Sequence, residues 1–441
     1  MEDLREKARK VLVEWKGKSY AFGDGVLKQV GPFAKLLGKK ALLVVVDLGQ
    51  HWVEPVRKEV ENSLTEHGLR YQTILGAAPN APREDLYRIA MQLSRSKGDF
   101  IIAIGGGSTI DAAKSAAVLA TYSAEEVQKA LGVSEAWAGT IEPYFGVGNV
   151  TKVKEATGRP VLPNIPVQTA ASSAAHLTRG SNITDPVSNQ KKLIVDGAIY
   201  PAAAVFDYSV TLNAPKSLTV DGGLDGIAHV WEVVTGAIGS PQYPRLLEVA
   251  EISMKLIVNG LQKLNRDLKD REARTALGLG TDLGGYMLMH GPGTHGPHLG
   301  SYSLVDLMSH GRACALLNPY YTVLFANAIQ GPLKMAASIF KEAGYIKTEA
   351  TKLSGRDLGM AVAQAMIIFW KELEFPTTLK EAGATKAHLQ RMLAAARNPQ
   401  LRMKLQQMPA PMEAEKGDVD RLMRPTLEAA FSGELERVPG F

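Results

Sequence analysis

Four of the nine histidines in this chain lie within residues 287–313, MLMHGPGTHGPHLGSYSLVDLMSHGRA. Imidazole binds divalent metals, and its ordinary pKa near neutrality also suits it to proton transfer. The other residues of the stretch are mostly apolar, glycine or hydroxyl-bearing, so the histidines are candidates for a metal centre. The alternative for any single one of them is a pH-sensitive surface loop. The four are His290, His295, His298 and His310.

A second segment supplies carboxylates. In GGLDGIAHVWEVVTG, Asp225, His229 and Glu232 stand at positions i, i+4 and i+7, which places them on one face of a helix. By itself, the pair of Asp225 and His229 can also be a surface ion pair or a capped core histidine. Combined with the histidine-rich stretch, it predicts one carboxylate and two or three imidazoles around Fe²⁺, Zn²⁺ or Ni²⁺, with a position left for a substrate oxygen. Cys314 is the only cysteine, so we expect nitrogen and oxygen ligands without a thiolate.

A glycine-rich turn predicts a phosphate site. IIAIGGGSTIDAAK places Gly105, Gly106 and Gly107 between a strand and a helix that Ser108 opens, where backbone amides can approach a phosphate. The turn follows the third strand, whereas the ordinary dinucleotide fingerprint follows the first. The alternative is a tight turn with a capping box from Ser108 to Asp111 and no ligand.

One carboxylate bears on the choice of cofactor. Asp47 ends the first predicted strand, where it could bind a ribose and disfavour a 2′-phosphate, which favours NAD over NADP. A helix N-cap or a loop aspartate is the other interpretation of Asp47.

The elements that position these residues divide the chain in two. Strand-like runs at 40–47, 71–75 and 99–105 alternate with helix-periodic runs at 52–68 and 83–98, which is typical of a parallel sheet with crossover helices. The pattern loosens over residues 121–165, which we interpret as an excursion at the sheet edge. From about residue 211 the pattern is helical. We therefore expect an α/β dinucleotide-binding domain over 1–210 and an all-α metal-binding domain over 211–441.

Composition excludes several classes of protein. Among 441 residues, 45% are hydrophobic and 22% charged, with a formal net charge of +5 and no apolar run of membrane-spanning length. Basic residues are scattered, which gives no support to nucleic-acid binding. The start, MEDLREKARK, lacks the apolar segment of a secretory signal, so we expect a cytoplasmic protein that binds neither membranes nor nucleic acids.

The combination resembles the iron-containing (group III) alcohol dehydrogenase family, whose relatives include glycerol dehydrogenase and dehydroquinate synthase. The resemblance runs through nearly the whole chain and in the family's order. It is carried by FGDG, GGGSTIDAAK, IPVQTAASSAAHLT, YPAAAVFD, GGLDGIAHVWE, GYMLMHG and SHGRACALLNPYYTVLFANA. It implies a dehydroquinate synthase-like fold with the active site in a cleft between the two domains, and a dimer or larger homo-oligomer.

The resemblance also implies roles for particular residues. Asp225, His229, His290 and His310 fall on the four metal ligands, and Gly105 to Ser108, with Asp111, fall on the pyrophosphate loop. Thr169 and Ser173 match hydroxyl positions near the nicotinamide, and Lys191, with Lys192 as the second choice, matches a lysine near the cofactor ribose. Two departures stand out: His176 occupies a position where the family commonly has glutamate, and the interval from His290 to His310 is long. His295 or His298 could therefore replace His290 as a ligand; in the preferred assignment one of them, His295 first, is a catalytic proton relay.

The function implied by the resemblance is hydride transfer between a nicotinamide cofactor and a metal-bound alcohol or aldehyde. NAD is the expected cofactor, with NADP as the alternative, and Fe²⁺ the expected metal ahead of Zn²⁺ or Ni²⁺. Three rival functions of the same fold remain: a hydroxyacid-oxoacid transhydrogenase, a glycerol dehydrogenase and a dehydroquinate synthase-like lyase. The lyase would need several Lys and Arg around the metal, and the histidine-rich stretch has only Arg312.

Overall fold

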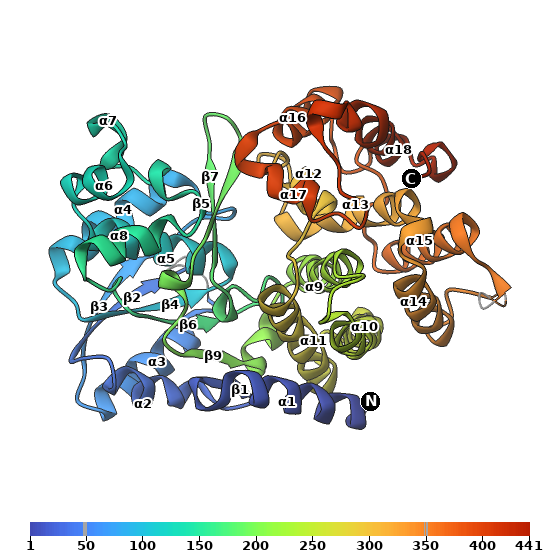
Figure 1. The fold of residues 1–441 in the computed structure, drawn as a ribbon. Helices are drawn as coiled ribbons and strands as arrows, with labels where there is room; N and C mark the ends of the chain where they lie inside the picture. Colours follow the sequence, from blue (N-terminus) through green and yellow to red (C-terminus); the bar gives the residue numbers. More distant parts are fainter. Residues whose placement is uncertain (47–50, 348, 350–351) are drawn as a thin grey trace. The chain divides into compact units, whose positions relative to one another are not determined.

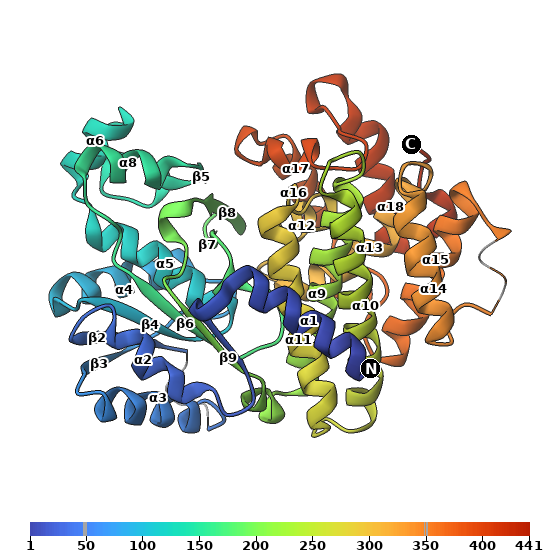
Figure 2. The ribbon, with the colours of Figure 1, turned by 60° about the horizontal axis from the view of Figure 1, so that its bottom comes forward.

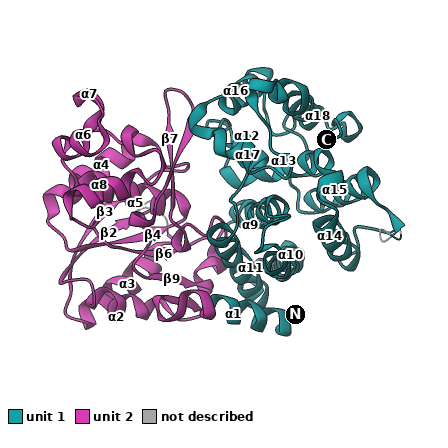
Figure 3. Cartoon of the chain, in the orientation of Figure 1, with its two compact units in different colours: residues 1–12, 215–441 teal, residues 13–214 magenta. Residues whose placement is uncertain are grey.

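The chain forms two compact units, which Figure 3 distinguishes by colour. A computed structural model describes residues 1–46, 51–347, 349 and 352–441. One unit spans Val13–Ala214, and the other combines Met1–Leu12 with Pro215–Phe441. The sequence places the boundary near residue 210, four residues before the end of the first of these units, but it assigns the first twelve residues to the opposite unit. Helix α1 (Glu2–Lys16) contributes to both.

The Val13–Ala214 unit is built on a parallel sheet of six strands in the order β1-β9-β6-β4-β2-β3. Strand β4 and the neighbouring β2 are buried along almost their whole length, as the continuous apolar runs predict. Helices α4 and α5 pack on one face, and α2 and α3 lie on the other (Figure 2). The bounds are β1 Tyr20–Gly23, β2 Lys40–Val45, β3 Arg70–Leu75, β4 Phe100–Gly105, β6 Asn164–Gln168, β9 Ala204–Asp207, α2 Val30–Lys35, α3 Glu54–Glu66, α4 Arg83–Ser96 and α5 Gly107–Thr121. The predicted parallel α/β domain is confirmed.

The region predicted as an irregular excursion is largely helical. It contains α6 (Ala124–Leu131), α7 (Glu135–Ala138) and α8 (Asn149–Thr157), and its short strand β5 (Gly146–Val147) joins a second sheet. That sheet has the order β5-β8-β7, with β7 (Gly180–Asp185) and β8 (Gln190–Val195) antiparallel. The excursion connects β4 to β6, two adjacent strands inside the main sheet, so it does not lie at the sheet edge. The sequence does not reveal these helices, because they are short and the glycines and prolines between them interrupt the periodic pattern.

The residues from Pro215 onward form a helical unit, as predicted (Figure 1). Helices α9, α10 and α11 pack closely together. A Cβ added at Gly226 of α9 would lie 2.8 Å from Thr281 Cγ2 of α11, and one at Gly280 would lie 2.6 Å from Ile257 of α10. The glycines of this region therefore serve close helix packing. None of the helices in the described part of the chain is long and apolar enough to span a membrane.

The predicted metal-binding residues lie on α9, α11, α12 and α13 of this unit. The bounds of the α-helices after Pro215 are α9 Lys216–Gly236, α10 Tyr243–Arg266, α11 Arg271–His290, α12 Gly296–Ser301, α13 His310–Leu324, α14 Gln330–Glu342, α15 Gly355–Glu372, α16 Lys386–Ala396, α17 Arg402–Gln406 and α18 Arg424–Ser432.

Candidate active site

Helix α9 presents the predicted acidic and histidine face inside the helical unit. Asp225 is 2% exposed, His229 5% and Glu232 0%. His229 Nδ1 lies 3.9 Å from Asp225 Oδ2, one helical turn away. A surface ion pair, one of the two alternatives, does not describe side chains this deeply buried.

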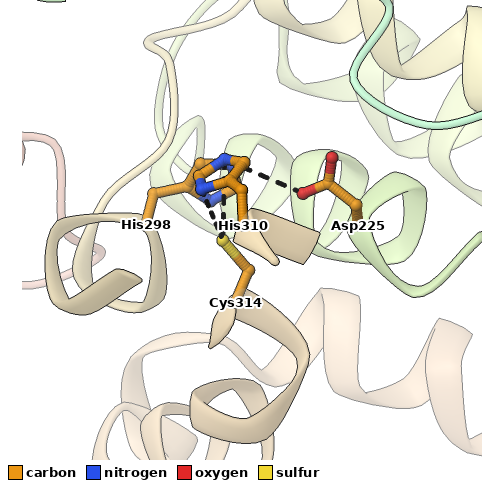
Figure 4. Close-up of side chains that lie close together, drawn as sticks. All are labelled: Asp225, His298, His310 and Cys314. Atoms are coloured by element: carbon orange, nitrogen blue, oxygen red, sulfur yellow. Dashed lines mark hydrogen bonds and ion pairs between the residues drawn. The ribbon is translucent and has the colours of Figure 1, made fainter. Parts of the chain in front are cut away.

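Helices α12 and α13 bring two further imidazoles to this face. The ring centroid of His298 lies 4.7 Å from that of His229 and 5.0 Å from that of His310. His310 Nε2 lies 3.9 Å from Asp225 Oδ1 (Figure 4). Three segments that are distant in sequence therefore converge within one unit, where Asp225 lies 3.9 Å from both His229 and His310.

The structure does not bring His290 to this group. His290 is exposed at the last position of α11, where its Nδ1 bonds the Tyr286 carbonyl oxygen at 2.9 Å and its ring stacks on Tyr286 at 4.0 Å. His298 instead lies beside His229 and His310, and it is one of the two alternatives to His290 that the long interval before His310 suggested.

A thiol also lies in the group. Cys314 Sγ is 3.9 Å from each ring nitrogen of His310, and donor atoms of Asp225, His298, His310 and Cys314 all lie within 4.8 Å of one another. The expectation of nitrogen and oxygen ligands alone stays a prediction, but the structure places a sulfur atom beside the histidines and the carboxylate. The spacing of His310 and Cys314 at i and i+4 was the signal that could have revealed it.

Glu232 positions the imidazole ring of His298. Its Oε1 lies 2.6 Å from His298 Nδ1, and its Oε2 accepts a hydrogen bond from the backbone N–H of His295 at 2.8 Å. Burial raises the pKa of the Glu232 carboxyl, an effect that the nearby His295 and Lys404 and the backbone hydrogen bonds oppose. With Nδ1 donating to the carboxylate, His298 Nε2 carries the lone pair that a cation needs. The sequence places Glu232 on the correct face but does not reveal this role.

His295 is held by bonds within its own unit. It caps the N-terminus of α12, where its Nδ1 accepts the backbone N–H of Gly296 at 2.8 Å, and its Nε2 lies 3.1 Å from Thr235 Oγ1. Burial lowers the pKa of His295 to about 4, so the ring is neutral near pH 7. Both ring nitrogens are thus engaged in positioning α12, which gives no support to the predicted proton relay.

The donor set fits a divalent cation. Asp225 Oδ1 and His229 Nδ1 are buried and have no hydrogen-bond partner among the described residues. An unpaired buried polar group costs about 1–3 kcal/mol, more when it is charged, and a bound cation would remove that cost. One carboxylate with three imidazoles suits Fe²⁺, Zn²⁺ or Ni²⁺.

The glycine turn of the α/β unit differs in detail from the sequence prediction. Gly106 is the N-cap of α5, and no side chain caps the helix. Ser108 Oγ instead accepts the backbone N–H of Asn80 at 3.0 Å, and Asp111 Oδ2 accepts that of Asn182 at 3.0 Å. The capping box considered as the alternative does not form, and the buried Asp111 carboxylate anchors β7 rather than facing a ligand.

The three glycines are not equivalent. A Cβ at Gly105 would lie 2.8 Å from Thr109 Cβ, and one at Gly107 would lie 2.5 Å from Ser173 Oγ. At Gly106 the only neighbour within contact range would be Ala170 Cβ at 3.8 Å. Gly105 and Gly107 therefore allow the chain to pack, whereas Gly106 leaves room for a ligand beside the backbone.

The other predicted cofactor residues have different surroundings. Thr169 donates its backbone N–H to the Gly105 carbonyl at 3.1 Å, and its buried Oγ1 has no hydrogen-bond partner among the described residues. Ser173 lies against Gly107, as shown above. Lys191 is buried on β8 within electrostatic reach of Asp111. Asp47 lies outside the described residues.

A parallel α/β unit with a glycine turn after β4, and a buried cluster of possible metal ligands in the helical unit, are typical of a metal-dependent enzyme that binds a nucleotide. The family model described as iron-containing alcohol dehydrogenase matches residues 17–208, and its C-terminal counterpart matches residues 219–426. The chain therefore belongs to the iron-containing alcohol dehydrogenase family.

Named relatives extend over most of the chain. A long-chain-alcohol dehydrogenase of Geobacillus thermodenitrificans is 26% identical over 94% of this chain and 95% of its own length. An NAD-dependent methanol dehydrogenase of Bacillus methanolicus is 28% identical over 61% of this chain, and the match spans 65% of that enzyme. Among solved structures, an alcohol dehydrogenase from Oenococcus oeni has a TM-score of 0.76 at 22% identity, covering 93% of this chain and 98% of its own. At that identity the structure supports the fold alone.

Proposed function

We propose that this protein is a metal-dependent, NAD-linked alcohol dehydrogenase that also reduces aldehydes, with NADP as the alternative cofactor. The observation that carries the proposal is the convergence of Asp225, His229, His298 and His310, in which buried atoms of Asp225 and His229 have no hydrogen-bond partner among the described residues. The names of the relatives, which include dehydrogenases of methanol, long-chain alcohols and 1,3-propanediol, support a small alcohol or aldehyde as substrate.

Asp225, His229, His298 and His310 would hold the metal, with Fe²⁺ first and Zn²⁺ or Ni²⁺ as alternatives. Such an ion supplies Lewis acidity toward the alcohol or carbonyl oxygen, while the nicotinamide supplies the hydride chemistry. His298 replaces the originally predicted His290 in this set.

Residues of the chain orient the metal-binding side chains and exclude water from them. Glu232 holds the His298 ring by its Nδ1, which fixes the ring's direction and the nitrogen it presents. Glu232 also binds the backbone at His295, so the same carboxylate fixes the start of α12. Burial of Asp225, His229 and His298 keeps water from competing for them.

For the cofactor, we propose that the backbone around Gly106 receives the pyrophosphate, with Gly105, Gly107 and Ser108 shaping the turn. Thr169 and Ser173 border the same turn and are proposed to lie toward the nicotinamide, and Lys191 toward the ribose. Asp47 remains a prediction for the ribose contact. A homodimer or larger assembly and a cytoplasmic location complete the proposal.

The deciding experiment combines metal analysis with two assays. Purified protein is expected to contain about one divalent ion per chain and to oxidise NADH when given simple aldehydes. Exchange between a hydroxyacid and an oxoacid without net change in NADH would instead establish the transhydrogenase. Failure to bind a metal, or full activity after its complete removal, would refute the proposed function.

A further inference from the structure

We propose that Cys314 is a direct ligand of the metal centre when the ion is thiophilic, as Co²⁺, Zn²⁺ and Cd²⁺ are. The inference rests on the proposed metal-dependent function and adds a thiolate to the residues that are proposed to bind the metal ion. Cys314 is completely buried, and its sulfur belongs to the group of donor atoms that lie within 4.8 Å of one another. Sulfur, carboxylate oxygen and imidazole nitrogen at these separations can share one ion after small side-chain adjustments.

The thiol faces a group that already requires a cation. The Asp225 carboxylate is 2% exposed, and its Oδ1 has no hydrogen-bond partner among the described residues. Figure 4 shows Asp225 on one side of the His310 ring and Cys314 on another, with His298 beside them. This buried oxygen, which has no hydrogen-bond partner among the described residues, is an observation independent of the cysteine and points to the same ion.

Helix α13 holds its two donors in register. His310 and Cys314 are one turn apart, so both project from the same face of the helix. Arg312 donates to Asp221 Oδ1 of α9 at 2.9 Å, and Ser309 Oγ donates to Asp221 Oδ2 at 2.6 Å. A Cβ at Gly311 would lie 2.4 Å from the Asp221 carbonyl oxygen, so α13 meets α9 at contact distance. The sulfur is therefore fixed near Asp225.

Ligation by Cys314 gives the centre two alternative ligand sets. Asp225, His298 and His310 are common to both, and the fourth donor is either His229 or Cys314. Coordination forms a sulfur–metal bond and releases the thiol proton to the buffer. A thiolate favours Zn²⁺, Co²⁺ and Cd²⁺ over harder ions such as Mg²⁺ and Mn²⁺, so Cys314 strengthens a preference that the imidazoles already give.

Cobalt spectroscopy of the full-length protein tests the inference. Metal-free enzyme is titrated with Co²⁺, and the near-ultraviolet sulfur-to-cobalt charge-transfer absorption is followed together with the visible cobalt bands. Because the chain has one cysteine, any sulfur-to-cobalt absorption comes from Cys314. Wild type is compared with Cys314→Ser and Cys314→Ala, and thermal unfolding of the metal-free proteins verifies that the variants are folded.

We expect wild type to show both sets of bands, and Cys314→Ser to retain the visible bands while losing the charge-transfer absorption. Cd²⁺ affinity should fall in both variants by at least the roughly 10- to 100-fold that the loss of an outer hydrogen-bond partner causes at metal sites. Stoichiometric Co²⁺ binding by wild type without charge-transfer absorption would overturn the inference and leave the proposed function intact. Absence of any metal binding would overturn both.

Discussion

Glu232 Oε1 lies 2.6 Å from His298 Nδ1, and the two side chains are 0% and 3% exposed. Such a pair fixes both the orientation of a ligand histidine and the nitrogen that faces the ion. The same carboxylate binds the backbone N–H of His295, so it couples the start of α12 to α9.

The pair predicts the effect of Glu232→Gln. The substitution preserves the size of the side chain but replaces the carboxylate that accepts a hydrogen bond from His298 Nδ1. The affinity for the metal should therefore fall about 10- to 100-fold. Chelator competition measures the affinity, and thermal unfolding of the metal-free protein separates it from general destabilisation. Glu251→Gln, at an exposed carboxylate of α10, is the matched control and should bind metal like wild type. Equal metal affinity in the two variants would contradict the positioning role.

Two histidines of the same stretch should behave oppositely. His298→Ala removes a buried donor and should reduce metal affinity by at least about 100-fold, with a parallel loss of activity. His290→Ala removes an exposed ring and should leave metal content unchanged. Metal analysis after dialysis decides between them, and loss of metal from the His290 variant alone would restore the original assignment.

Asp225→Ala and His229→Ala should abolish metal retention while leaving the fold largely intact. Each removes a buried atom that has no hydrogen-bond partner among the described residues, so no hydrogen bond of that atom is lost. Excess metal should raise the melting temperature of wild type, since about 2.7 kcal/mol of stabilisation accompanies a ligand at 100 times its Kd, and should not raise that of the variants. Circular dichroism melts with and without metal measure this; stabilisation of both variants equal to that of wild type would reject the site.

The glycine turn offers a matched pair of substitutions. Gly106→Ala adds a methyl group where the protein leaves room, at a φ of −82° that alanine accepts, so stability should change by less than about 1 kcal/mol. If the pyrophosphate lies there, the KM for NAD should rise roughly tenfold, equivalent to about 1.4 kcal/mol. Gly107→Ala collides with Ser173 and should destabilise by about 1–3 kcal/mol. An unchanged KM for Gly106→Ala would place the pyrophosphate elsewhere.

Lys114 predicts a pH dependence of stability in the α/β unit. It is buried and donates to the carbonyl oxygens of Ala175, Thr178 and Gly180, and burial lowers the pKa of Lys114 from 10.5 to about 8, partly offset by Asp111. Between pH 8 and 10.5 the unfolded chain therefore holds more protons at this position, so the group's contribution to the free energy of unfolding rises with pH by up to about 1.4 kcal/mol per unit.

Lys114→Met should lower stability at pH 7 by about 1–3 kcal/mol, because buried carbonyls lose their donor, and should flatten the rise above pH 8. Urea unfolding at several pH values measures the slope. Lys152→Met, at an exposed lysine of α8, controls for the loss of a charge. A slope equal to that of wild type would show that Lys114 keeps its proton through this range.

The sequence predicted the architecture and much of the site because both depend on local patterns. Buried apolar strands, glycine turns and the i, i+4, i+7 face of α9 are readable from residue types and spacing. Which of His290, His295 and His298 lies beside Asp225 and His310 could not be predicted from the sequence, since it depends on where α11 ends and how α12 turns back toward α9. The roles of Glu232 and Cys314 also required the packing of α12 and α13, and the short helices of residues 121–165 carry too few turns to show a periodic pattern.

Helix α1 gives the helical unit an unusual order of assembly. Residues 1–12 belong to that unit, with Ala8 and Leu12 completely buried, yet residues 13–214 form the other unit before Pro215 is reached. This short segment is synthesised before residues 13–214, and therefore well before the helices of its own unit that follow Pro215. Its apolar side chains lack those helices while the other unit is made, and a deletion within residues 1–12 acts on the unit that carries the metal ligands.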